Sequence, residues 1–139
     1  MKLHQTINLL LLACSVYACG QIGNHVHNEA QTMKSNIIQN QIVRQAFDAW
    51  QKADTDLWLS LFTNNAELFD DENPRDFYKF STEAIGHERF LSIDKIEEDG
   101  TRIYGHFHSD TWGDFKTYFH FHIDSQGRIY KLNIGQADY

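Results

Sequence analysis

Residues 101–135 read TRIYGHFHSDTWGDFKTYFHFHIDSQGRIYKLNIG, and this stretch decides the fold. Apolar and polar side chains alternate along it, which is typical of β-strands that lay one face on a core. The apolar alternates of the first two strands are Ile103, Phe107, Phe115, Phe119, Phe121 and Ile123. The opposite face carries Arg102, Tyr104, His106, His108, Lys116, Tyr118, His120 and His122. With a third strand that holds Tyr130, Leu132 and Ile134, the stretch predicts an antiparallel, three-stranded unit.

The register of these strands can be predicted from the direction of their side chains. Both apolar sets of the first two strands have odd numbers, so paired positions must have an even sum. A loop at Thr111–Gly113 then gives the pairs His106 with Tyr118, Tyr104 with His120, and His108 with Lys116. After the second turn, at 125–127, the apolar positions become even, which indicates a two-residue loop or a β-bulge.

The preceding residues predict helices and short strands. Apolar side chains from Ile38 to Trp50 recur at steps of three and four, so we expect an amphipathic helix of about four turns, capped by Ser35 or Asn36. A second, short helix is expected after Asp54 or Thr55 and ends at 63–65, followed by a strand at Ala66–Asp70. A third helix is expected at about 75–85, with Pro74 in its first turn and Gly86 as its stop, and a strand at 88–97.

Composition excludes several classes of function. The chain has 139 residues, enough for one domain with a hydrophobic core, and a formal net charge of −7. It has no cluster of Lys and Arg, so nucleic-acid binding and electrostatic adsorption to anionic lipid are not expected. No Ser-His-Asp spacing, glycine-rich phosphate loop or paired CxxC motif is present, and no cofactor is expected.

The N-terminus predicts export. Lys2 precedes an apolar run, Ile7–Ala13, that is too short to span a bilayer. Cys14 and Cys19 each follow small residues, as in the lipobox of bacterial lipoproteins. We expect residues 1–19 to form a signal peptide with Cys19 as the lipidated residue (Cys14 is the alternative), and residues 20–34 to form a polar tether. The expected location is the bacterial cell envelope, lipid-anchored on the periplasmic side or at the outer membrane; secretion after ordinary cleavage is the alternative.

Two runs resemble a known superfamily. FDAWQKADTDLWLSLFTNNAELFDD, at 47–71, is similar to the helix–helix–strand opening of NTF2-like proteins, particularly the SnoaL-like branch. FHFHIDSQGRIYKLNIGQAD, at 119–138, resembles the closing strand pair of that branch. The resemblance covers about residues 36–137 and implies an α+β cone at 35–139, in which a strongly bent, mainly antiparallel sheet wraps the N-terminal helices and a pocket opens between them.

Such folds carry both enzymes and binding modules, so two hypotheses stay open. One is a non-catalytic domain that binds a small apolar ligand or a partner protein, as a homodimer through the sheet face. The other is a lyase or isomerase that moves a proton with a pocket carboxylate or histidine. The inner sheet face offers no such group on the first two strands of the stretch, which favours binding.

A pocket would be lined mainly by aromatic residues, with a filled core as the alternative. The expected lining is Trp50, Trp58, Phe62, Phe69, Tyr78, Phe107, Thr117, Phe119, Phe121 and Tyr130. Thr117, Tyr78 and Tyr130 are the polar groups expected to point inward. The acidic turn offers Asp70 and Asp71 as candidate bases. Trp112, at a hairpin tip, is expected either at the rim or in contact with a partner.

The polar sheet face carries four histidines, His106, His108, His120 and His122. Imidazoles on adjacent strands can bind Zn²⁺. Their expected partners, however, are tyrosine and lysine, so we favour a face that is solvated or covered by a second subunit. A pH-sensitive interface is a further hypothesis.

Overall fold

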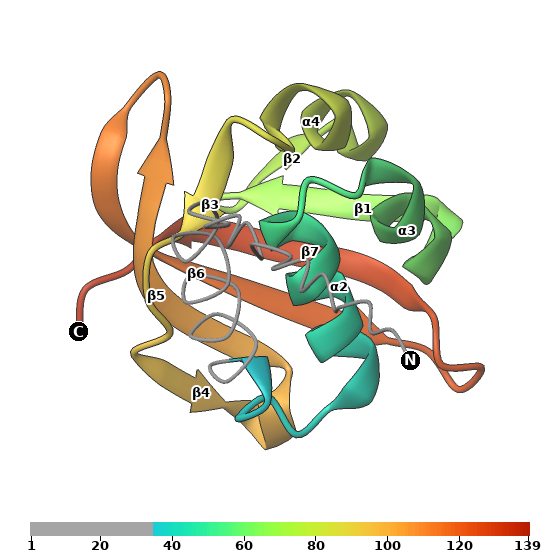
Figure 1. Cartoon of the computed structure of the whole chain (residues 1–139). Helices are drawn as coiled ribbons and strands as arrows, with labels where there is room; N and C mark the ends of the chain where they lie inside the picture. Colours follow the sequence, from blue (N-terminus) through green and yellow to red (C-terminus); the bar gives the residue numbers. More distant parts are fainter. Residues whose placement is uncertain (1–34) are drawn as a thin grey trace, which may run out of the picture.

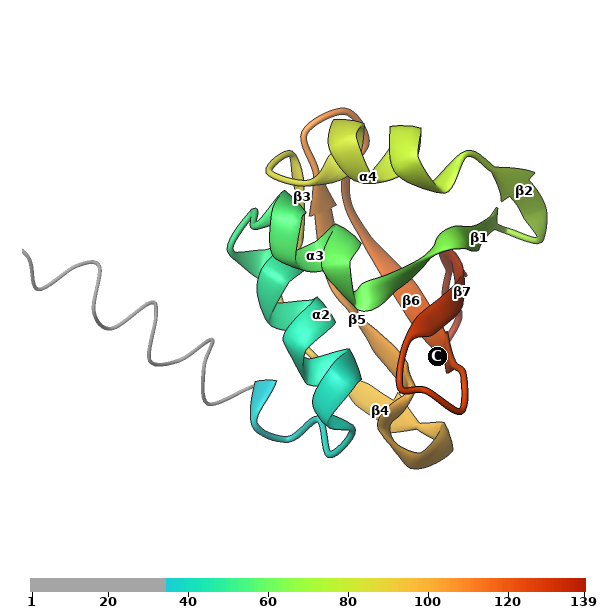
Figure 2. The same cartoon turned by 90° about the vertical axis from the view of Figure 1, so that its right-hand side faces the viewer.

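The computed structural model describes residues 35–139, and the expected signal peptide, Cys14, Cys19 and the tether lie outside them. In the described part, three α-helices lie against one face of a bent, open sheet of seven strands (Figure 1). Figure 2 shows the same three helices on one side of the sheet from a perpendicular direction. This architecture confirms the expected α+β, NTF2-like cone.

The sheet is mixed. Its strand order is β2-β1-β7-β6-β5-β3, and β4 also pairs with β5. All neighbours are antiparallel except β1 and β7. The bounds are β1 Phe62–Asp70, β2 Asn73–Arg75, β3 Glu88–Phe90, β4 Lys95–Glu97, β5 Arg102–Ser109, β6 Gly113–Ile123 and β7 Ile129–Gln136, with a 3-10 turn, η1, at Glu98–Gly100.

The helices are α2 Gln41–Gln51, α3 Thr55–Leu61 and α4 Phe77–Ala84. Helix α2 begins later than expected, because the Asn40 side chain accepts hydrogen bonds from the backbone N–H groups of Ile42 and Val43 at 3.1 and 3.2 Å. The expected caps Ser35 and Asn36 are therefore wrong. Asp54 caps α3 as expected. Asp76 caps α4, and Pro74 lies in β2 and not in the helix.

The core lies between α2 and the inner face of the sheet. Trp50, from α2, contacts Trp58 and Phe119 at ring-centroid distances of 4.9 and 5.3 Å. Phe107 and Phe119 are 2% and 3% exposed, so the expected inward face of β5 and β6 is confirmed. Trp58 Nε1 donates to Ser81 Oγ at 3.0 Å, which satisfies a buried donor and joins α3 to α4.

The predicted register of β5 and β6 is wrong by two positions. Tyr104 pairs with Tyr118 and His106 pairs with Lys116. The turn begins one residue earlier than expected because Ser109 Oγ accepts the N–H groups of Thr111 and Trp112. His108 therefore pairs with Asp114, and Arg102 with His120. The two faces are unchanged, because a shift of two keeps every side chain on its side.

A β-bulge accounts for the change of parity between β6 and β7. Ile123 pairs with Ile129 whereas His122 pairs with Lys131, so Tyr130 is the extra residue. Ile129 is fully buried and Tyr130 is 42% exposed. A bulge was one of the two expected explanations, with a two-residue loop as the other, but the assignment of Tyr130 to the inner face is wrong.

The expected strand at 88–97 is divided into β3 and β4, both on the edge of β5. Between them, the N–H groups of Leu91 and Ser92 both approach the carbonyl oxygen of His106. Gly105 permits this approach, because a Cβ there would lie 1.9 Å from the carbonyl oxygen of Ser92. The side-chain amide of Gln51 pairs with both backbone groups of Phe90, which attaches α2 to this edge.

Within residues 35–139, no helix is long and apolar enough to cross a membrane.

Candidate functional site

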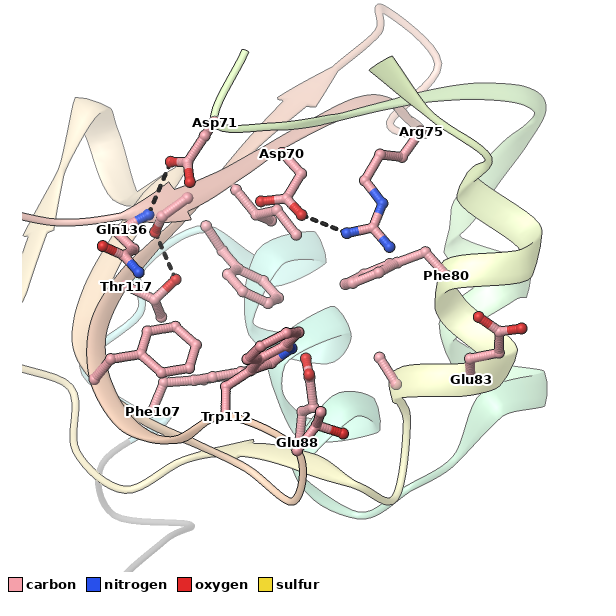
Figure 3. A pocket seen from close by; sticks show the side chains of 16 residues that line it. Asp70, Asp71, Arg75, Phe80, Glu83, Glu88, Phe107, Trp112, Thr117 and Gln136 are labelled. Carbon is pink, nitrogen blue, oxygen red and sulfur yellow. Dashed lines mark hydrogen bonds and ion pairs between the residues drawn. The ribbon is translucent and has the colours of Figure 1, made fainter. Parts of the chain in front are cut away.

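A cavity of about 510 Å³ opens between α4, the end of β1 and the inner face of β5, β6 and β7 (Figure 3). Its volume falls in the range of small-molecule sites. The residues that line it are Asp70, Asp71, Arg75, Phe80, Glu83, Ala84, Glu88, Phe107, Thr111, Trp112, Phe115, Thr117, Phe119, Ile134, Gly135 and Gln136.

The floor of the cavity is apolar. Phe107, Phe119 and Phe80 each lie against the buried indole of Trp50, with centroid distances of 6.3, 5.3 and 5.7 Å. Ile134 of β7 is 6% exposed and completes this surface. Because the rings are held by mutual contacts, the floor is formed before any ligand binds.

One side of the rim is an ion pair. Arg75 Nη1 of β2 lies 2.5 Å from Asp70 Oδ2 at the end of β1, and the guanidinium lies over the ring of Phe80 at 5.7 Å. Figure 3 shows both side chains at the same edge of the cavity. β1 and β2 pair with Asp70 opposite Asn73, so the tight β1–β2 turn places the two charges together.

A second polar group lies where β1 leaves the sheet. Asp71 Oδ1 accepts the backbone N–H of Gln136 at 3.0 Å, and the Asp71 N–H donates to the carbonyl of Ile134. Position 135 must be glycine for this contact, because a Cβ would lie 2.2 Å from Asp71 Oδ1. Thr117 Oγ1 donates to the carbonyl of Gly135 at 2.7 Å.

Glu88, the first residue of β3, lies on the opposite side of the cavity from Asp70 (Figure 3). Burial raises the pKa of its carboxyl group, and the hydrogen bond from Ser109 Oγ, at 3.0 Å, lowers it in part. The negative charge of Asp70 adds to the rise and the positive charge of Arg75 opposes it. Glu88 is the cavity carboxylate whose proton affinity the fold clearly increases.

The rim has a strong charge bias. Four carboxylates, those of Asp70, Asp71, Glu83 and Glu88, face one guanidinium. Trp112, in the β5–β6 loop, also lines the cavity although it is 77% exposed. The cavity therefore combines an aromatic floor, an acidic rim and one large exposed ring at its mouth.

The structure brings together five of the residues proposed from the sequence. Asp70, Asp71, Phe107, Thr117 and Phe119 all line the cavity. Four others are buried in the core and do not line it: Trp50, Trp58, Phe62 and Phe121.

Three further expected positions are wrong. Tyr78 is 65% exposed and Tyr130 is displaced by the bulge, so neither points inward. Phe69 lies on the outer face of β1, because its neighbour Leu68 is 1% exposed and faces the core.

Sequence reasoning missed the residues that come from other elements. Arg75 and Glu88 sit on three-residue strands with no recognisable alternation. Phe80 belongs to the apolar spacing of α4, but only the packing of that helix shows that its ring reaches the cavity. Ile134 was expected to face inward, and this signal could have placed it in the pocket.

The four histidines of the outer face are bound to different partners. His106 Nδ1 lies 2.8 Å from Asp94, and His108 Nδ1 lies 2.5 Å from Asp114. His120 and His122 contact each other at a centroid distance of 4.1 Å. Among residues 35–139, no group of three His, Cys, Asp or Glu side chains could hold a metal ion. The zinc hypothesis therefore gains no support, and the sheet-face homodimer stays a prediction.

Solved structures share this fold. An NTF2-like protein of unknown function from Cytophaga hutchinsonii superposes with a TM-score of 0.56 at 11% identity, over 69% of this chain and 87% of that chain. A protein from Sinorhizobium meliloti assigned as a polyketide cyclase gives 0.54 at 20% identity, over 67% and 92%.

The orange carotenoid protein of Anabaena (Nostoc) sp. PCC 7120, in a structure that binds canthaxanthin, gives a TM-score of 0.56 at 19% identity. The alignment covers 70% of this chain but 35% of that protein, so the similarity concerns about one third of it. No family model and no curated protein matches the sequence. The structural neighbours establish that the fold is NTF2-like, of the type found in SnoaL-like proteins.

Proposed function

We propose that this domain is a small-molecule binding module whose cavity takes a mainly apolar ligand with a neutral or basic polar group. The observation that carries the proposal is the pairing of an aromatic floor with an acidic rim in one cavity of about 510 Å³. The orange carotenoid protein, which has this fold in part of its chain and binds canthaxanthin, supports an apolar ligand by analogy only.

The floor supports the apolar part of the ligand. Phe107, Phe119 and Ile134 already lie in the core, so a flat ligand placed on them removes its own surface from water at little cost in ordering the protein. Trp112 would cover the outward side of the ligand, since its indole is exposed at the mouth.

The rim supports the choice of charge. An anionic ligand would approach four carboxylates and find one guanidinium, and that guanidinium is already paired with Asp70. An ammonium group or a hydroxyl donor meets free carboxylate oxygens instead. The acidic rim therefore favours basic and neutral ligands over acids.

Two carboxylates expected from the sequence are poorly suited to proton transfer. Asp70 is paired with Arg75, and Asp71 accepts a backbone N–H that holds the end of β7. A base must present a free oxygen to its substrate. These engagements favour binding over catalysis.

Glu88 carries the alternative function. Its pKa is raised by burial and its carboxyl group lines the cavity, which are the two features expected of a general base. The alternative is therefore a SnoaL-like lyase or isomerase in which Glu88 removes a proton next to a carbonyl group.

Matched ligands test the proposal. We would titrate the protein with 2-naphthylmethylamine, 2-naphthylmethanol and 2-naphthoate and measure affinity by calorimetry. The amine and the alcohol should bind, and the carboxylate should bind about tenfold more weakly. Equal affinity for all three, or preference for the carboxylate, would contradict the proposed selectivity.

A flat ketone separates binding from catalysis. In heavy water, 2-tetralone exchanges its acidic protons, which NMR can follow. A binding module leaves this rate at its buffer value. An acceleration that Glu88→Gln abolishes while the ketone still binds would establish the enzyme and overturn the non-catalytic proposal.

We also propose that the domain is tethered to a bacterial envelope membrane through acylated Cys19. The support is the apolar run at 7–13 and the small residues before each cysteine. Acyl chains hold a protein on a membrane without a spanning helix.

A further inference from the structure

A second hollow, of about 420 Å³, lies on the outer face of the sheet, away from the core and the cavity. It is lined by Glu72, Arg102, Tyr104, Tyr118, His120, His122, Lys131 and Asn133. Strand register brings them together, because Arg102 pairs with His120, Tyr104 with Tyr118, and His122 with Lys131.

Two cations line the hollow, and they have one carboxylate partner between them. Arg102 Nη1 lies 3.1 Å from Glu98 Oε1 of η1. Its Nε atom is buried and has no hydrogen-bond partner within residues 35–139. The side-chain ammonium of Lys131 has no ion-pair or hydrogen-bond partner within that range, and only its backbone pairs with β6 and β1. The Lys131 ammonium is therefore a cationic donor without a partner on this face, and Glu67, Glu72 and Glu98 lie around it.

The two histidines are arranged as neutral rings. His120 Nδ1 accepts from Arg102 Nη2 at 2.9 Å, so its proton is on Nε2, which donates to Glu98 Oε2 at 3.0 Å. His122 Nε2 donates to Asn133 Oδ1 at 2.8 Å, which leaves His122 Nδ1 as an unprotonated atom. A proton added there would create a third cationic donor beside Lys131.

Burial and the surrounding charges together favour the neutral form of both rings. Burial is the main cause that lowers the pKa of both histidines. The neighbouring His122 lowers the pKa of His120 further, whereas the hydrogen bond to Asn133 raises the pKa of His122 in part. The positive charges of Arg102 and Lys131 lower both pKa values, and Glu98 opposes them. An anion placed in the hollow would reverse the effect of the two cations.

We propose that this hollow is a second ligand site, which takes a small aromatic oxyanion held by Lys131, Arg102 and His122. The oxyanion is a carboxylate or a phosphate, which share the needed chemistry. The Tyr104 and Tyr118 rings, 6.1 Å apart, supply a surface for the aromatic part, and the Tyr118 hydroxyl is a further donor.

Binding at this site is linked to a proton. The anion favours protonated His122, so affinity rises as the pH falls from about 7.5 to about 6. The other charged or titratable groups that face the imidazoles are Glu98 of η1, Arg102 and Tyr104 of β5, Tyr118 of β6, Lys131 of β7, Glu72 of the β1–β2 turn, and Glu67, which pairs with Lys131 from β1. The three carboxylates limit how much the affinity for the anion can increase as the pH falls, but the affinity still increases.

The test uses probes of one shape and three charges. Benzoate, phenyl phosphate and benzylamine are titrated into the purified chain at about pH 6 and about pH 7.5, with amide chemical shifts as the readout. Both anions should shift the 102–104, 118–122 and 131–133 backbone signals, and benzylamine should not. Benzoate, whose own charge does not change between the two pH values, should bind about fivefold more tightly at the lower pH.

Matched variants make the outcome specific. Lys131→Gln should weaken both anions about tenfold, whereas Lys116→Gln, on the same face but outside the hollow, should leave them unchanged. His122→Gln should remove most of the pH dependence. The thermal midpoint of each variant is measured to confirm that it is folded, and the mass in solution is measured alongside.

Three results would overturn the inference: shifts scattered over the surface, equal weakening by Lys116→Gln and Lys131→Gln, or a stable dimer that buries the hollow and binds neither anion. A preference for benzoate or for phenyl phosphate identifies the natural ligand as a carboxylic acid or as a phosphate ester. The hollow lies on the outer face of the sheet and the cavity on the inner face. A negative result for the hollow therefore leaves the proposal for the cavity unchanged.

Discussion

Asp70 and Arg75 form an ion pair of 2.5 Å at one edge of the cavity, five positions apart and on two antiparallel strands. Both side chains are partly exposed, so the pair adds little to stability. Its effect is local: it removes one carboxylate from use as a base and fixes the single guanidinium of the rim. The charge that a ligand meets is therefore that of the remaining acids.

Trp112→Ala tests the role of the ring at the mouth. Because the indole is 77% exposed, its removal should leave the thermal midpoint unchanged. Affinity for 2-naphthylmethanol should fall about threefold to tenfold, the value of one aromatic contact. Calorimetry measures it, and Tyr78→Ala, which removes an exposed ring outside the cavity, is the control. Equal effects of the two changes would show that the indole does not cover the ligand.

Glu88→Gln tests the burial of that carboxyl group. Its folded-state pKa is raised, so the native protein loses stability as the pH rises from the ordinary glutamate range through the folded pKa. The amide cannot ionise and still accepts from Ser109. The variant should therefore be the more stable protein at about pH 7 and should match the parent at about pH 4.

Thermal unfolding at the two pH values measures this difference. Glu83→Gln, an exposed rim residue on α4, is the control. If the thermal midpoints of variant and parent differed equally at both pH values, or if the parent were more stable at about pH 7, burial would not be the main cause of the raised pKa of Glu88.

Gly105→Ala tests the close approach of the β3–β4 segment to β5. The added Cβ would meet the Ser92 carbonyl oxygen at 1.9 Å, so the edge must move. We expect a loss of about 1–3 kcal/mol in the free energy of unfolding, measured in urea. Gly127→Ala, where the Cβ meets open space but φ is +78°, shows the cost of left-handed backbone strain without a clash, a strain that position 105 does not have. An unfolding free energy for Gly105→Ala equal to that of the parent would show that the clash is unimportant.

The alternation at 101–135 was enough to predict the inner face, because burial of one face constrains every second residue. It could not predict hairpin register, since that depended on a local hydrogen bond: Ser109 Oγ accepts two backbone N–H groups and moves the turn. Tyr130 was misplaced for a similar reason, because the sequence indicates that a bulge exists but not which residue it ejects.

The site was only partly predictable. Thr117 was identified as a polar group expected to point inward, and Asp70 as a member of the acidic turn. The cavity also contains Arg75, Phe80 and Glu88, which the packing of α4 and of two very short strands places there. No periodic pattern in the sequence predicts this packing.

Palmitate labelling in a bacterial host tests the proposed anchor. Cys19→Ser should abolish incorporation of labelled palmitate, and Cys14→Ser should retain it. The reverse result would move the anchor to Cys14, and labelling that survives both changes would remove the lipoprotein proposal.

The most direct test of the central claim is to locate a neutral ligand by NMR. With 2-naphthylmethanol bound, we expect nuclear Overhauser effects from the naphthyl ring to the methyl groups of Ala84, Thr117 and Ile134, all of which line the cavity. Contacts confined to methyl groups elsewhere, such as those of Leu57, or no binding at all, would contradict the account.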